Sequence, residues 1–370
     1  MKFKNESCPK TMKYFNNVVH LIILTALLCT ACSKDESTEL ETDDTTPTVK
    51  TESFYTVLKE EDIIYAEGLS HDQSSTSPFP IPIKLDVYYP DNNSTNRPVF
   101  MFIHGGGFTG GIKHKPEIVD MANYYASRGW VFVSIDYRTT EELGVIQGMT
   151  PEKLLVYYKG IAPQEWVDNA LQGAQSSGQV QQATAMYLAQ RDAKAALRWI
   201  VANASTYNIN KDFITVGGAS AGAITTIALG ISNQEDFRDE ISISDDPTLS
   251  TTNINESYKV RSMVYFWGSN KKLDVFEAVY DLEQYDRYDP SDPELFMGHG
   301  TAEDPVTPYE EALELQGIYH SLGIYNKLVT LLLPNGNPAG HGAWNAVVDG
   351  IGLSELTLDF LVERQNLTVE

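Results

Sequence analysis

Hydrophobic and more polar positions alternate over residues 83–88, where Ile83, Leu85 and Val87 form the apolar set. This period of two is typical of a half-exposed strand. Farther along the chain the apolar runs become continuous, which is typical of strands buried on both faces of a parallel sheet. Such runs span residues 99–103, 131–135, 213–216, 263–267, 295–297 and 328–333.

Helical stretches separate these predicted strands. One is predicted over residues 182–204, because a single face of that helix carries Ala193, Ala196, Leu197 and Ile200. Further helices are predicted over residues 116–128, 221–231, 309–322 and 344–363. The repeated alternation predicts an α/β fold: a mostly parallel, doubly wound sheet of about eight strands with helices on both faces.

Residues 52–370 contain no linker, internal repeat or low-complexity run, and we interpret them as one catalytic domain. Two stretches within it, residues 139–181 and 232–259, are longer than a simple connection needs. We interpret both as cap-like insertions that face a substrate. Plain surface decoration is the alternative.

The first 31 residues have the pattern of a targeting segment. A basic start precedes an apolar run over residues 18–28, which is too short to span a bilayer but suits a signal peptide. The run ends in Leu28-Cys29-Thr30-Ala31-Cys32, which resembles a bacterial lipobox. We therefore predict cleavage before Cys32 and lipidation of Cys32. An ordinary cleaved signal peptide with an incidental cysteine is the alternative.

Residues 32–51 are rich in charged and hydroxyl side chains, and such a stretch buries too little apolar surface to offset its ordering entropy. It is predicted to be a disordered acidic tether. Within it, Lys34-Asp35-Glu36 resembles the surface-export signal of Bacteroidetes-type lipoproteins. The expected location is the outer membrane or the cell surface, with the lipid anchor as the membrane contact. A soluble secreted protein is the alternative.

Composition narrows the chemistry of the body. The three cysteines are Cys8, Cys29 and Cys32, so a disulfide framework, a thiolate zinc site and a cysteine nucleophile are excluded from residues 33–370. The formal net charge of −23 argues against nucleic acid as a partner.

The pattern G-x-S-x-G occurs at residues 218–222, between the predicted strand over 213–216 and the predicted helix from 221. At such a strand-to-helix turn a serine hydroxyl stands clear of the sheet, and Gly218 and Gly222 permit close backbone approach. We interpret Ser220 as a nucleophile. An ordinary glycine-rich turn is the alternative.

A glycine run follows the predicted strand over residues 99–103, in the order His104, Gly105, Gly106, Gly107. Acyl transfer develops negative charge on a carbonyl oxygen and needs fixed N–H donors there. We predict that the donors are the amides of Gly106, Gly107 and Ala221. A phosphate-binding loop is the alternative, but neither of its usual glycine patterns accompanies the run.

The serine needs a base, and the base needs an orienting carboxylate. Of the seven histidines, His341 alone follows the last predicted strand, on a loop that can reach the nucleophile. The loop after the strand over residues 295–297 carries Asp304, which we predict as the acid, with Glu303 as the competitor. Either carboxylate could instead be a solvated loop charge.

With these motifs the chain resembles esterases and lipases of the α/β-hydrolase superfamily that carry an H-G-G-G oxyanion motif. Carboxylesterases, hormone-sensitive-lipase-like esterases and bacterial feruloyl or acetyl-xylan esterases are such families. The resemblance extends from about Ile83 to Phe360, includes residues 134–138 and 191–196, and has the same Ser…acid…His order. One departure concerns the acid: the segment from His299 is one residue longer than the usual H-G-T-x-D.

The resemblance implies hydrolysis of a carboxylic ester through an acyl-enzyme, on short-chain or carbohydrate-linked esters. Two alternatives are a serine peptidase of the same superfamily and a non-catalytic surface binding protein. No metal or organic cofactor is implied.

Overall fold

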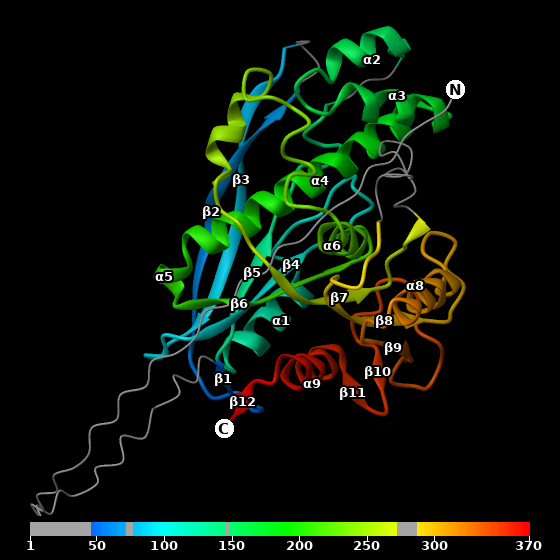
Figure 1. The fold of residues 1–370 in the computed structure, drawn as a ribbon. Coiled ribbons are helices and arrows are strands. Elements are labelled where there is room, and N and C mark those ends of the chain that lie inside the picture. Colours follow the sequence, from blue (N-terminus) through cyan, green and yellow to red (C-terminus); the bar gives the residue numbers. More distant parts are fainter. Residues whose placement is uncertain (1–45, 72–76, 145–147, 272–286) are drawn as a thin grey trace, which may run out of the picture. The chain divides into compact units, whose positions relative to one another are not determined.

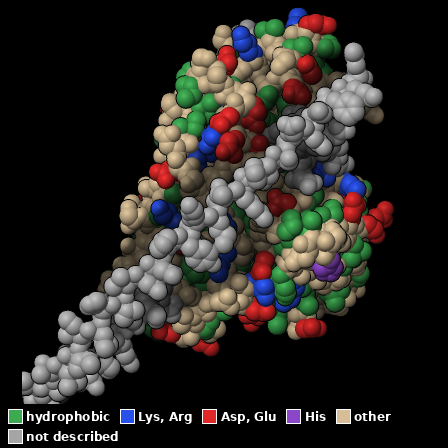
Figure 2. Space-filling view, viewed as in Figure 1, with side chains coloured by type: hydrophobic (Ala, Val, Ile, Leu, Met, Phe, Trp, Pro, Cys, Tyr) green, Lys and Arg blue, Asp and Glu red, His purple; other side chains and the backbone are tan. Residues whose placement is uncertain are grey.

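The computed structural model describes residues 46–71, 77–144, 148–271 and 287–370 (Figure 1). The predicted signal peptide, most of the predicted tether and the predicted lipidation site at Cys32 lie outside these ranges. Within them, the structure contains no helix whose length and apolar character would let it cross a membrane. Acidic side chains are spread over the described surface on the face shown in Figure 2, as the net charge of −23 leads one to expect.

An eight-stranded sheet forms the centre of the domain, with the strand order β2-β3-β5-β4-β6-β7-β8-β9 (Figure 1). Six strands, β4 to β9, are parallel to one another. At one edge, β2 pairs antiparallel with β3, and β3 pairs antiparallel with β5. Their bounds are Val57–Ser70 (β2), Phe79–Pro90 (β3), Arg97–Ile103 (β4), Val131–Ile135 (β5), Ile209–Ala219 (β6), Val260–Phe266 (β7), Glu294–Gly300 (β8) and Asn326–Leu331 (β9). The α/β fold and its mostly parallel sheet are therefore confirmed.

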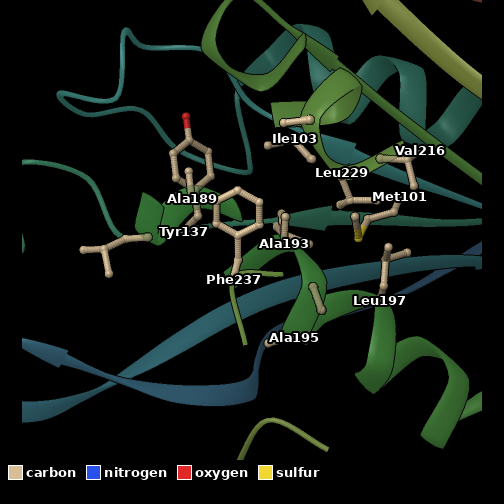
Figure 3. Close-up of a cluster of buried hydrophobic side chains, with 14 of the residues drawn as sticks. Met101, Ile103, Tyr137, Ala189, Ala193, Ala195, Leu197, Val216, Leu229 and Phe237 are labelled. Carbon is tan, nitrogen blue, oxygen red and sulfur yellow. The ribbon is translucent and has the colours of Figure 1, made fainter. Parts of the chain in front are cut away.

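Helices cover both faces of this sheet. One face carries α4 (Ser177–Ala202), α6 (Ala221–Ile231) and α8 (Tyr309–Ser321), and the other carries α1 (Pro116–Ala126) and α9 (Leu353–Gln365). Figure 3 shows part of the hydrophobic core between the sheet and the helices α4 and α6. Met101 and Val216 of the sheet lie there near Leu197 of α4 and Leu229 of α6. A short helix, α5 (Ala204–Tyr207), follows α4.

The structure adds an edge strand that the sequence pattern did not indicate. Strand β2 has 14 residues, but most of its first half is exposed and carries consecutive charges. Its register with β3 shifts between Glu60 and Ile63, and Asp62 has a φ of 56°. Because these bulges interrupt the period of two, the apolar alternation needed for a prediction is lost.

The last helix begins later than predicted. Residues 347–352 form a small hairpin of β10 (Val347–Val348) and β11 (Ile351–Gly352), and α9 starts only at Leu353. Asp349 and Gly350 have φ values of 53° and 84°. An Asp-Gly pair with two positive φ values is the favoured two-residue hairpin turn, so the local turn chemistry overrides the helical pattern here.

The ordered body begins earlier than predicted. Strand β1 (Thr48–Val49) pairs in parallel with β12 (Thr368–Val369), and Val49 is 1 % exposed. The end of the predicted tether is thus held on the body, because the strand pairing and the burial of Val49 offset the entropy that the polar composition leaves uncompensated.

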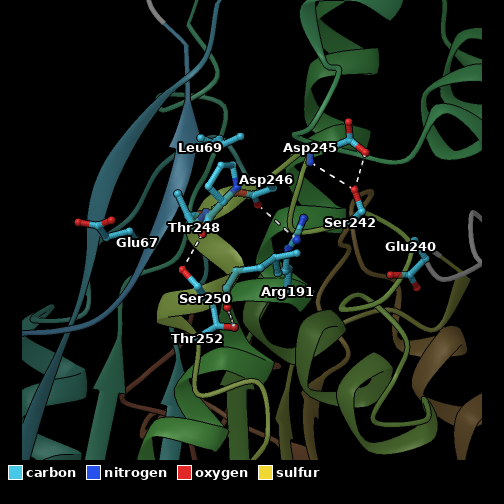
Figure 4. Close-up of polar contacts among 12 residues, drawn as sticks. Glu67, Leu69, Arg191, Glu240, Ser242, Asp245, Asp246, Thr248, Ser250 and Thr252 are labelled. Carbon is cyan, nitrogen blue, oxygen red and sulfur yellow. Dashed lines mark hydrogen bonds and ion pairs between the residues drawn. The ribbon is translucent and has the colours of Figure 1, made fainter.

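Both long insertions pack on α4. Residues 139–181 contain α2 (Pro151–Tyr157) and α3 (Gln164–Gly173), and α3 lies along α4. Residues 232–259 contain the 3-10 helix η1 (Pro247–Thr251), whose Thr251 hydroxyl accepts a hydrogen bond of 2.8 Å from the N–H of Glu67 on β2. Figure 4 shows this region, where Arg191 of α4 lies 3.3 Å from the carboxylate of Asp246.

Candidate active site

The sharpest turn of the site lies between β6 and α6, at Ser220. Its φ of 55° and ψ of −121° are strained for a residue with a side chain, and its N–H donates to the carbonyl of Phe266 at 2.9 Å. A Cβ on Gly218 would lie 2.3 Å from the carbonyl of Gly222, and one on Gly222 would lie 2.0 Å from the carbonyl of Ile103. Both glycines of the G-x-S-x-G pattern are therefore required by close backbone approach.

The structure brings the three predicted triad residues together. The Nε2 atom of His341 lies 2.9 Å from Oγ of Ser220, and its Nδ1 lies 2.8 Å from Oδ2 of Asp304. His341 is on the loop after β9, and Asp304 is on the loop after β8, so neighbouring strands of the sheet present both side chains. The His341 side chain is 35 % exposed and that of Asp304 only 4 %, which places the histidine at the surface and the aspartate behind it.

Burial and hydrogen bonding distinguish the two candidate acids. Glu303 is exposed, whereas the carboxylate of Asp304 accepts hydrogen bonds from the N–H groups of Val306 and Thr307 at 2.9 and 3.1 Å. Burial alone raises the pKa of Asp304, but hydrogen bonds from the Thr307 hydroxyl, the two N–H groups and His341 outweigh it and lower this pKa to about 2. Asp304 is therefore ionised at neutral pH and able to accept a hydrogen bond from the Nδ1–H of His341.

Thr307 is a residue of the site that the motifs did not reveal. Its hydroxyl donates to Oδ2 of Asp304 at 2.7 Å, and its oxygen lies 2.9 Å from Nδ1 of His341. The available sequence signal was the spacing Asp304-Pro305-Val306-Thr307, since an aspartate often binds the backbone two or three residues later.

The glycine loop after β4 lies directly against Ser220. A Cβ on Gly105 would be 2.7 Å from the carbonyl of Ala219 and 3.0 Å from Cβ of Ser220. Gly106 and Gly107 have φ values of 141° and 63°, which a residue with a side chain rarely adopts. A Cβ on Gly106 would also lie 1.9 Å from the carbonyl of Gly110.

Hydrogen bonds to carbonyl groups hold two of the three predicted donor amides, those of Gly106 and Gly107. The carbonyl of Gly105 is bonded by Nδ1 of His104 at 2.8 Å, and the carbonyl of Gly106 accepts from both N–H and Oγ1 of Thr109 at 3.0 Å. Because a peptide group is planar and trans, fixing these carbonyls also fixes the N–H groups of Gly106 and Gly107 on the opposite side. Ala221 is the first residue of α6, where an N–H has no partner within the helix.

His104 supports this loop as a neutral side chain. Burial lowers the pKa of His104, and its bond to the Gly105 carbonyl requires a proton on Nδ1. Its ring stacks on Tyr137 with a centroid distance of 4.4 Å, and the Tyr137 hydroxyl donates to the His104 carbonyl at 3.0 Å. The residue after Tyr137 is Arg138, which forms a buried ion pair with Asp192 of α4 at 2.6 Å.

The insertion that contains α2 and α3 also connects to the glycine loop. Nε2 of Gln182, near the start of α4, donates to the carbonyl of Gly107 at 2.6 Å. The neighbouring Gln181 donates to the carbonyl of Thr140 at 3.1 Å. The two glutamines therefore join the start of the 139–181 insertion, α4 and the loop beside Ser220.

The α/β-hydrolase class is defined by a mostly parallel sheet and by a serine on a strained strand-to-helix turn. An acid and a histidine follow on later loops. The family model BD-FAE matches residues 85–147 and 179–318, more than half of the chain. The chain belongs to this family of α/β-hydrolase esterases and is a carboxylic ester hydrolase. The match includes Ser220 and Asp304 and omits most of the α2–α3 insertion.

Two solved structures of one esterase share the fold, and a third structure is a weaker match. Propionate-bound esterase 2 (Est2) of the planctomycete Thermogutta terrifontis has a TM-score of 0.53 and 18 % identity, covering 82 % of this chain and 93 % of its own. The same enzyme phosphoramylated by tabun has a TM-score of 0.52 and 19 % identity, covering 82 % and 94 %. A truncated carbohydrate esterase from gut microbiota has a TM-score of 0.48 and 17 % identity, covering 86 % and 99 %.

Proposed function

We propose that the enzyme hydrolyses carboxylic esters through an acyl-enzyme on Ser220, with His341 as the general base and Asp304 as the orienting acid. The observation that carries the proposal is the 2.9 Å contact between Nε2 of His341 and Oγ of Ser220. It occurs on a turn with a φ of 55°, where the strain serves to present the hydroxyl.

The first step transfers the Ser220 proton to Nε2 of His341 as Oγ attacks the ester carbonyl. Asp304 stabilises the resulting imidazolium through Nδ1. The N–H groups of Gly106, Gly107 and Ala221 are the proposed donors to the oxyanion. His341 then protonates the leaving alcohol, and a water molecule activated by the same imidazole releases the acid.

Esters of short acyl chains or of carbohydrate alcohols are the proposed substrates. An exposed base at the surface suits an acyl group presented on a larger alcohol, because little of that alcohol needs to be enclosed. Est2, whose fold this chain shares, was solved with propionate bound, which supports a short acyl chain.

The test compares hydrolysis of p-nitrophenyl acetate and p-nitrophenyl octanoate by residues 33–370 and by their Ser220→Ala variant. Turnover that disappears in the variant, with acetate preferred, is the expected result. Turnover that the variant retains would exclude Ser220 as the nucleophile. A folded protein that cleaves only anilides would be a peptidase, and one that reacts with neither esters nor anilides nor a fluorophosphonate would be a binding protein.

We further propose that the enzyme is exported and anchored by a lipid on Cys32. The support is the lipobox-like sequence Leu28-Cys29-Thr30-Ala31-Cys32 after an apolar run. In a bacterial host fed a labelled fatty acid, label should enter the full-length protein and be lost on Cys32→Ala, while Cys29→Ala retains it. Equal labelling of the Cys32→Ala variant would contradict the anchor.

A further inference from the structure

The hydroxyl of Thr307 completes a closed set of contacts behind the base. It lies 2.7 Å from Oδ2 of Asp304 and 2.9 Å from Nδ1 of His341, and these last two atoms are 2.8 Å apart. Thr307 is 1 % exposed, so its hydroxyl does not compete with solvent water for these contacts in the folded protein.

The direction of each bond follows from the charges. Asp304 is ionised and can only accept, so the single hydroxyl proton of Thr307 goes to Oδ2. The Thr307 oxygen then has lone pairs left to accept from the Nδ1–H of His341, which it shares with Oδ2. The other carboxylate oxygen is occupied by the N–H groups of Val306 and Thr307.

We infer that Thr307 is a positioning residue for the base. Its hydroxyl stabilises the imidazole form with the proton on Nδ1, which leaves the lone pair of Nε2 directed at Ser220. It also helps to prevent rotation of the Asp304 carboxylate. The hydroxyl holds Oδ2, while the N–H groups of Val306 and Thr307 hold Oδ1. This inference rests on the proposed function of Ser220 and His341 and assigns a fourth side chain to that site.

The test uses two substitutions that separate the hydroxyl from the bulk of the side chain. Thr307→Val keeps the volume and removes both contacts, whereas Thr307→Ser keeps the hydroxyl. If the usual net free energy of one hydrogen bond is lost from the transition state, kcat of Thr307→Val should fall roughly three- to tenfold. KM for p-nitrophenyl acetate should stay unchanged, because Thr307 is buried behind the triad. Thr307→Ser should recover most of the lost kcat.

Thr357→Val provides a matched control. Thr357 is also fully buried, and its hydroxyl lies 2.7 Å from that of Tyr125, on the α1–α9 side of the sheet. This variant should lower the melting temperature while leaving kcat unchanged. Circular dichroism on all variants ensures that kcat is compared between folded proteins.

Three results would overturn the inference: an unchanged kcat in Thr307→Val, a Thr307→Ser variant no better than Thr307→Val, or a rise in KM in place of a fall in kcat. If Thr307→Val does not fold, the Thr307→Ser variant and the rate at which a fluorophosphonate labels Ser220 in Thr307→Ala decide the question. Any of these outcomes leaves the proposed function intact as long as Ser220→Ala abolishes the wild-type turnover.

Discussion

The buried ion pair between Arg138 and Asp192 offers a quantitative test of what joins the loop after β5 to α4. Oδ1 of Asp192 lies 2.6 Å from Nη2 of Arg138, and Oδ2 accepts from Nε and from the backbone N–H, each at 2.9 Å. Both side chains are only 3 % exposed. Desolvation lowers the pKa of Arg138, but the charge of Asp192 and its hydrogen bonds outweigh this and raise it, so the guanidinium stays charged.

Replacing Asp192 by Leu leaves this guanidinium charged, buried and without its carboxylate. Loss of one partner of a buried pair costs about 3–5 kcal/mol of unfolding free energy. The double variant Arg138→Met with Asp192→Leu removes both charges from the interior, and it should regain most of that loss because neither desolvated charge remains. The measurement is urea unfolding of each variant, followed by tryptophan fluorescence and by circular dichroism.

An exposed pair of the same length serves as the control. Arg238 and Asp239 also approach to 2.6 Å, but the Asp239 side chain is 54 % exposed. Asp239→Leu should therefore cost less than about 1 kcal/mol. The reasoning is refuted if Asp192→Leu costs as little as Asp239→Leu, or if the double variant is no more stable than Asp192→Leu alone.

Three further outcomes are expected. Gly222→Ala should abolish turnover or folding, because its Cβ would lie 2.0 Å from the carbonyl of Ile103; soluble protein with wild-type kcat would contradict this close approach. Thr109→Val should lower kcat by less than about tenfold, because the backbone N–H of residue 109 still holds the Gly106 carbonyl when the hydroxyl is lost. A fall in kcat of roughly a hundredfold, as expected for loss of an entire oxyanion donor, would show that the hydroxyl dominates. The pKa of Asp304 is lowered to about 2, so its carboxylate should stabilise the fold above pH 4 and lose this contribution as the pH falls towards 2. Acid unfolding of Asp304→Asn should lack that component, and identical pH dependence in both proteins would contradict the lowered pKa.

The three side chains that the structure brings together could be selected from the sequence because each depends on local sequence. Ser220 follows a continuous apolar strand and lies between glycines, and His341 is the histidine after the last such strand. The parallel strands β4 to β9 were predictable for a similar reason: strands buried on both faces need no alternation to be recognised.

Features that depend on distant pairing were not predictable in the same way. Strand β2 is an edge strand with a charged, bulged half, so its pattern carries no period. Helix α4 was expected to bury one face, but Arg191, Lys194 and Arg198 of this helix are buried as well. Their carbonyl and carboxylate partners come from residues 233–252, which no helical pattern reveals.

Three strained residues follow neighbouring central strands of the sheet. Phe108, Ser220 and Trp267 are non-glycine residues with φ values of 61°, 55° and 36°, and they follow β4, β6 and β7, which are neighbours in the sheet. Each such conformation costs on the order of 1–3 kcal/mol and persists only where the surrounding structure enforces it. Here the enforcement comes from buried strands on one side and from packing on the other, since Phe108 and Trp267 are 4 % and 2 % exposed. A rigid parallel sheet can therefore hold the strained turn at Ser220 and the glycine loop in fixed relation before any substrate binds. The proposed oxyanion donors would then need no reorganisation during the reaction.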